Sequence, residues 1–193
     1  MRIVIVDDSG LRATVLEEGL RDAGYDDIHV IPPQSGFVAR LERMAPDVVL
    51  MDLGSPSRDT LEEMLAVSRA LAKPIAMFVD QSDEAMIGAA IDAGISAYVV
   101  DGLRKERVKP VLDLAIRRFN AFARMQAELQ EAKTALAERK TVDRAKAILM
   151  QTRNLSEADA YALLRSTAMN QNRRIADIAE ALIMASTLLE KKP

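Results

Sequence analysis

Short apolar runs alternate with amphipathic stretches along the first 110 residues of the chain. Four continuous apolar runs have the length of a strand, at residues 3–6, 48–51, 75–79 and 97–100. A weaker run at 28–31 is expected nearer an edge of the sheet. Continuous runs are typical of strands that are buried on both faces of a parallel sheet. Helical stretches are predicted between them, at about 11–23, 35–44, 59–72 and 83–93. The alternation predicts an α/β doubly wound parallel five-stranded sheet.

Helical patterning replaces the strand pattern from about residue 104 onward. Pro110 lies in an early turn of the first helix, and a break is expected after Asn154. Ser156 is then a candidate N-cap for a second helix, and a last helix is predicted at about 175–190. The inner faces of this three-helix unit are predicted at Ala145, Ala147, Ile148, Leu149, Tyr161, Leu164, Ala168, Ile175, Ile178 and Ala179.

Apolar residues recur at heptad spacing in the long helix, over about two to three heptads. They are Phe122, Met125, Leu129, Ala132 and Leu136. This seam favours a short coiled coil that joins two copies of the chain as a homodimer. The alternative is one long helix that lies on its own domain.

Composition narrows the function classes. The chain of 193 residues is 49% hydrophobic and 28% charged, which excludes a disordered chain, and it has no cysteine and one histidine, His29. Thiolate zinc sites and cysteine nucleophiles are therefore excluded, and histidine triads are disfavoured. No apolar run reaches the roughly 18 residues of a membrane span, so we expect a cytoplasmic protein without membrane contact. Residues 1–110 carry 12 basic and 19 acidic residues, whereas residues 111–193 carry 14 and 10, so the basic rear half is the candidate partner for phosphates.

Three aspartates follow predicted strands. Asp7 and Asp8 end the first strand, and Asp52 ends the third. Because a crevice lies at the carboxyl ends of parallel strands, these carboxylates are expected to lie together, and Mg²⁺ would relieve their repulsion. The alternative is that Asp7 and Asp8 only cap the following helix.

The segments VIVDDSGLRATVLEEGL and DVVLMDLGSPS resemble the receiver domain of bacterial two-component response regulators, over about residues 1–120. The resemblance implies that the acid pair holds Mg²⁺ and that Asp52 accepts phosphate from a histidine kinase. Two positions depart from the family pattern. Val79 stands where receivers carry Thr or Ser, and Asp101 stands where they carry Lys. These departures favour control by a bound partner protein over control by a histidine kinase.

The segments RAKAILM, LSEADAYALLRSTAM and RRIADIA resemble an ANTAR domain, over about 134–190, after a coiled-coil linker helix at 111–142. The order of the parts is similar to NasT-type antiterminators of nitrate and nitrite assimilation. The resemblance implies binding to paired hairpins in a nascent leader transcript, which prevents terminator formation, and inhibition by a NasS-type nitrate-sensing protein.

Basic residues of the rear helices are the candidate RNA contacts. The main candidates are Arg144, Lys146, Arg165, Arg173 and Arg174, and the weaker ones are Arg139 and Lys140. An ordinary solvated helix surface is the alternative. A phosphorylation-controlled DNA-binding regulator and a pure protein–protein signalling module also stay open. An enzyme is disfavoured, because the chain offers no general base beyond carboxylates and no phosphate-cradling glycine loop.

Overall fold

The computed structural model describes residues 1–7, 9–34, 36–54 and 58–190. The chain divides into two compact units, Met1–Arg124 and Met125–Pro193. None of the helices in the described ranges is long and apolar enough to cross a membrane. Each unit is treated by itself below.

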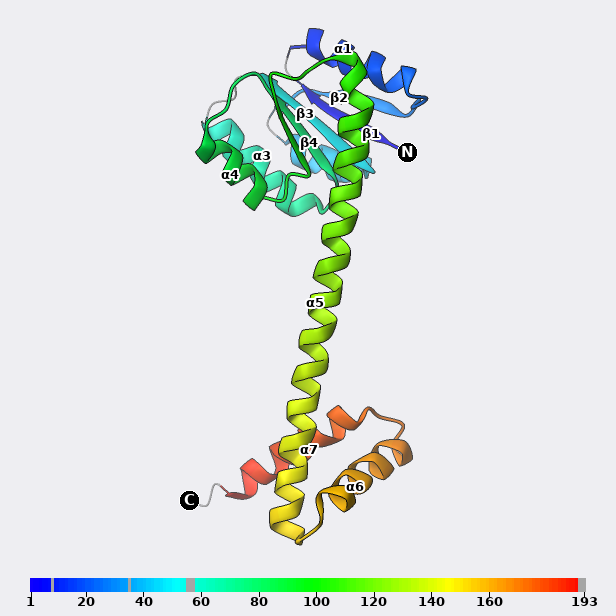
Figure 1. The fold of residues 1–193 in the computed structure, drawn as a ribbon, viewed down its shortest axis with the longest axis vertical. Helices are drawn as coiled ribbons and strands as arrows, with labels where there is room; N and C mark the ends of the chain where they lie inside the picture. The colour runs from blue at the N-terminus through cyan, green and yellow to red at the C-terminus, as the bar shows by residue number, and fades with distance from the viewer. Residues whose placement is uncertain (8, 35, 55–57, 191–193) are drawn as a thin grey trace. The chain divides into compact units, whose positions relative to one another are not determined.

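The first unit contains the predicted five-stranded parallel sheet (Figure 1). The strands are β1 (Ile3–Asp7), β2 (Ile28–Ile31), β3 (Val48–Gly54), β4 (Ile75–Val79) and β5 (Ala97–Val100). Their order is β2-β1-β3-β4-β5, and all neighbouring pairs are parallel. The doubly wound α/β prediction is confirmed, and the weak run at 28–31 does form an edge strand.

Helices cover both faces of this sheet. On one face lie α2 (Phe37–Met44), α3 (Arg58–Leu71) and α4 (Glu84–Asp92), which pack on one apolar cluster. On the other lie α1 (Leu11–Asp22) and the first turns of α5 (Lys105–Arg153), which pack on a second cluster. Gly19 lets α1 approach α5 closely, because a Cβ there would lie 2.8 Å from the carbonyl oxygen of Lys105.

The second unit is a three-helix cluster. It contains the end of α5, then α6 (Glu157–Asn170) and α7 (Ile175–Glu190). The predicted break follows α5, where Asn154 has a φ of 52°, and the Ser156 hydroxyl accepts the Asp159 N–H at 3.1 Å as the predicted N-cap. The buried residues are Ala145, Leu149, Ala160, Leu164, Ala168, Ala176, Ile178 and Ala179. The sequence-based assignment of Ala147 and Tyr161 to the inner faces is wrong, because both are exposed.

Candidate functional site

The sheet register brings two of the predicted aspartates together. Asp7 ends β1 directly opposite Asp52 on β3, and both side chains are buried. Asp8, the third member of the predicted metal site, lies outside the described residues.

Asp7 anchors the beginning of α1. Its carboxylate accepts the backbone N–H groups of Ser9, Gly10 and Ala13 at 3.2, 2.9 and 3.0 Å, and it also accepts the Ser9 hydroxyl. The N–H groups at a helix start have no partner within the helix, so a carboxylate there is stabilising. For Asp7, the helix-capping alternative describes the observed contacts.

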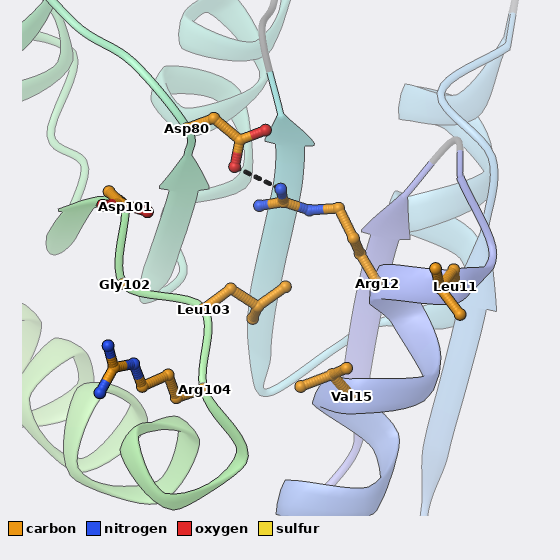
Figure 2. Close-up of a pocket in the computed structure, with 8 residues that line it drawn as sticks. All are labelled: Leu11, Arg12, Val15, Asp80, Asp101, Gly102, Leu103 and Arg104. Atoms are coloured by element: carbon orange, nitrogen blue, oxygen red, sulfur yellow. Dashed lines mark hydrogen bonds and ion pairs between the residues drawn. The ribbon is translucent and has the colours of Figure 1, made fainter.

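Arg12 completes this end of the sheet, and the sequence reasoning missed it. Its Nε lies 2.9 Å and 2.8 Å from the two carboxylate oxygens of Asp52, and its Nη2 lies 2.7 Å from Oδ1. Its Nη1 donates to Asp80, which follows β4 (Figure 2). The signal in the sequence was a basic residue in the first turn after the acid pair. Below, Asp7, Arg12, Asp52 and Asp80 are called the strand-end cluster.

The charges of this cluster are coupled. Burial raises the pKa of Asp52, and the hydrogen bonds and charge of Arg12 oppose that rise. In turn, the hydrogen bond to Asp52 raises the pKa of Arg12 although burial lowers it, so the guanidinium stays cationic. A buried carboxylate therefore has its counter-charge within the chain.

The oxygen atoms that Asp7 and Asp52 would offer to the predicted Mg²⁺ already have partners within the chain. Both oxygens of Asp52 are hydrogen-bonded to Arg12, and the carboxylate of Asp7 accepts several donors at the start of α1. Among the described residues there is no group of three or more His, Cys, Asp or Glu that could hold a metal ion.

The two positions that depart from the receiver pattern lie near the same sheet end. Val79 is buried at the end of β4, and its carbonyl accepts the N–H of Asp101 at 2.9 Å. Asp101 lines an open pocket beside Arg12 and Asp80 (Figure 2). Arg104 lines the same pocket, so its walls carry both signs of charge.

Two of the predicted RNA-binding cations, Lys146 and Arg174, form ion pairs within the second unit. Lys146 Nζ lies 2.7 Å from both Asp143 Oδ1 and Glu157 Oε1, and so ties α5 to α6. Its hydrogen bonds to these acids raise the pKa of Lys146.

Arg174 lies 2.7 Å from Glu138 on α5 and 2.9 Å from Asp177 on α7, and its hydrogen bond to Asp177 raises its pKa. Lys146 and Arg174 therefore have acidic partners within the unit.

The other candidate cations are exposed, and none forms an ion pair with a residue that the structure describes. They are Arg139, Lys140, Arg144, Arg165 and Arg173. Arg139 lines a groove with Tyr161 of α6 and Ile175 of α7. Tyr161 is 46% exposed, and Arg165 lies one turn further along the same face of α6. At 3.6 residues per turn, Lys140 and Arg144 lie about 100° and 140° around α5 from Arg139, on a different face.

The predicted heptad seam is uncovered in this unit and the preceding turns of α5. Phe122, Met125, Leu129 and Leu136 are 57%, 58%, 49% and 55% exposed, and Ala132 is also exposed. The dimer through this seam stays a prediction.

Comparison with protein families now places the chain. Residues 3–113 match the response regulator receiver domain, and residues 130–183 match the ANTAR domain. The chain belongs to the response regulators, with a receiver domain and an ANTAR domain. Both domains are typical of a family of regulators.

Relatives and solved structures agree with this assignment. The transcriptional regulatory protein PdtaR of Mycobacterium tuberculosis is 28% identical over 182 residues, which cover 94% of this chain and 89% of PdtaR. The nitrate regulatory protein of Klebsiella oxytoca is 33% identical over 85 residues, 44% of this chain but 22% of that protein.

Two receiver structures share the fold. That of a modulated diguanylate cyclase from Desulfovibrio desulfuricans G20 has a TM-score of 0.52 and 21% identity, and covers 62% of this chain and 95% of its own. A CheY-like receiver of Methanospirillum hungatei JF-1 has a TM-score of 0.52 and 17% identity, and covers 62% and 96%.

Proposed function

We propose that this response regulator is an RNA-binding antitermination factor. It binds paired hairpins in a nascent leader transcript and thereby prevents the terminator from forming. The ANTAR match over residues 130–183 carries the proposal. We assign its targets to nitrate and nitrite assimilation, on the NasT-type resemblance and the partial similarity to a nitrate regulatory protein.

The groove between Arg139 and Tyr161 is the favoured RNA surface. RNA sequence is read mainly in loops, where unpaired bases stack on aromatic rings and hydrogen-bond along their edges. Tyr161 offers an exposed ring beside Arg139, and Arg165 lies one turn away on the same helix face. Arg173, in the turn before α7, adds a further exposed guanidinium. Guanidinium groups suit phosphates and base edges because they donate two parallel hydrogen bonds.

Control is proposed to come from a partner protein of the NasS type rather than from a histidine kinase. The receiver lacks a hydroxyl at Val79 and has a carboxylate at Asp101, so a phosphoryl group on Asp52 would find neither a hydroxyl donor nor a lysine at these positions. The exposed seam on α5 is proposed to join two copies, which presents two ANTAR units to the two hairpins.

The test is gel-shift binding of the full chain to a two-hairpin leader RNA at one fixed salt concentration, since affinity driven by phosphate contacts falls steeply with salt. Arg165→Ala should weaken binding roughly 10- to 150-fold, from the loss of a charge-assisted hydrogen bond of about 1.5–3 kcal/mol. The matched control is Arg118→Ala, an exposed arginine on α5 outside the ANTAR match. Unchanged affinity in Arg165→Ala would remove this residue from the RNA surface.

Competition with a duplex DNA distinguishes RNA binding from the alternative function, DNA binding. If the DNA displaces the RNA, and binding rises when Asp52 is phosphorylated, the chain is a phosphorylation-controlled DNA-binding regulator. If neither nucleic acid binds, the antitermination proposal is wrong.

A further inference from the structure

We propose that Arg12 is the resident cation of the receiver, in the place that a divalent metal would take on Asp52. Arg12, and not a metal ion, then balances the negative charge of Asp52 whether or not Mg²⁺ is present. This inference concerns the first unit and does not depend on RNA binding.

The contacts of Arg12 cover the metal-binding atoms of Asp52. The Nε of Arg12 donates to both carboxylate oxygens of Asp52 at 2.9 and 2.8 Å, its Nη2 forms an ion pair with Oδ1 at 2.7 Å, and Asp52 is 0% exposed. Mg²⁺ would have to approach one of these oxygens to about 2.0–2.1 Å in octahedral geometry. A guanidinium and a divalent ion on the same carboxylate also repel each other, so the two cations compete.

Arg12 is held from two further directions. Its own backbone N–H donates to the Ser9 hydroxyl at 3.3 Å, and that hydroxyl donates to Asp7. On the far side, the Asp80 carboxylate accepts its Nη1. The backbone N–H of Asp80 donates to the Gly54 carbonyl at 2.6 Å, which fixes Asp80 at the end of β3.

These bonds also engage oxygen atoms that a hard cation would bind. The Gly54 carbonyl, the Asp7 carboxylate and the Asp52 carboxylate each accept a donor from the chain. A metal at this end of the sheet would have to displace Arg12 and leave Asp80 with one partner fewer. Asp52 is therefore already neutralised, and the receiver should not respond to Mg²⁺.

The test measures Mn²⁺ binding to the full chain by electron paramagnetic resonance of the free ion, with Mg²⁺ as competitor. The wild-type chain should show no saturable site at millimolar metal. Arg12→Ala should gain one site that Mg²⁺ competes for, and Arg12→Ala/Asp52→Ala should lose it again. The control is Arg21→Ala on the same helix, an exposed arginine paired with Glu17, which should behave as wild type.

A wild-type chain that binds one Mn²⁺ as tightly as Arg12→Ala would overturn the proposal. A second measurement covers the case in which Arg12→Ala does not fold. In the wild-type chain, the ¹⁵N–¹H resonance of Arg12 Nε should stay in place during titration with MgCl₂, with and without beryllofluoride. A saturable shift of that resonance would show that metal displaces Arg12 and would equally overturn the proposal.

Discussion

Removal of the Arg12 side chain should lower the free energy of unfolding of the first unit by more than the loss of an ordinary surface side chain would. In Arg12→Ala, the buried Asp52 loses its cation, so it must either carry an unpaired charge in the interior or take up a proton. Breaking one partner of a buried pair costs about 3–5 kcal/mol, and because Arg12 itself is 25% exposed we expect about 3 kcal/mol. For a unit of this size, that corresponds to a fall in Tm of roughly 10 °C.

A double-mutant cycle isolates the pair. Asp52→Ala should cost much less than Arg12→Ala, because it removes the buried charge itself and leaves Arg12 with Asp80. In Arg12→Ala/Asp52→Ala the cost should fall short of the sum of the two single costs by about 2 kcal/mol. The assay is urea unfolding of the full chain, followed by the amide resonances of β1 and β3. A coupling energy within about 0.5 kcal/mol of zero would refute the reasoning, because residues joined by a stabilising ion pair have larger coupling energies than that.

Three further changes test other parts of the account. Gly19→Ala should destabilise the first unit by about 1–3 kcal/mol, because its Cβ would lie 2.8 Å from the carbonyl oxygen of Lys105. Gly88→Ala, at a position in α4 that faces open space, should stabilise the unit by about 0.5–1 kcal/mol. Equal effects of the two substitutions in urea unfolding would contradict the close approach of α1 to α5. Leu129→Glu should convert a dimer to monomer in sedimentation velocity, and a persisting dimer would exclude the α5 seam. Leu164→Ala should cost the ANTAR unit about 2–5 kcal/mol in the same urea assay, and a loss below 1 kcal/mol would mean that this residue is not in its core.

The fold could be predicted from the hydrophobic pattern because each strand of the receiver is a short apolar run. β3 is the instructive exception. The apolar run ends at Met51, yet the strand continues to Gly54 through a fully buried Asp52. Burial of that carboxylate depends on Arg12, which comes from a different element, so hydropathy along the chain could not show it.

The strand-end cluster could be predicted in part. Strand ends place Asp7 near Asp52, but the number of carboxylates does not reveal which cation neutralises them. That choice depends on the reach of Arg12 from α1 across to β3, and a basic residue in the first turn after the acid pair does not by itself reveal that reach.

In the second unit, too, the sequence does not reveal which charged side chains pair with one another. A sequence does not distinguish a free surface cation such as Arg165 from one held in an ion pair, such as Lys146, which bridges α5 and α6. The prediction that Tyr161 lies on an inner face is wrong, because its side chain is exposed and lines a groove with Arg139.

The most direct test of the antitermination account is the affinity of the unphosphorylated wild-type chain for a two-hairpin leader RNA, compared with the same RNA carrying mutated loops, at one salt concentration. The account predicts tight binding that depends on the loops and does not change with beryllofluoride. Equal affinity for the two RNAs, or binding only after beryllofluoride is added, would contradict it.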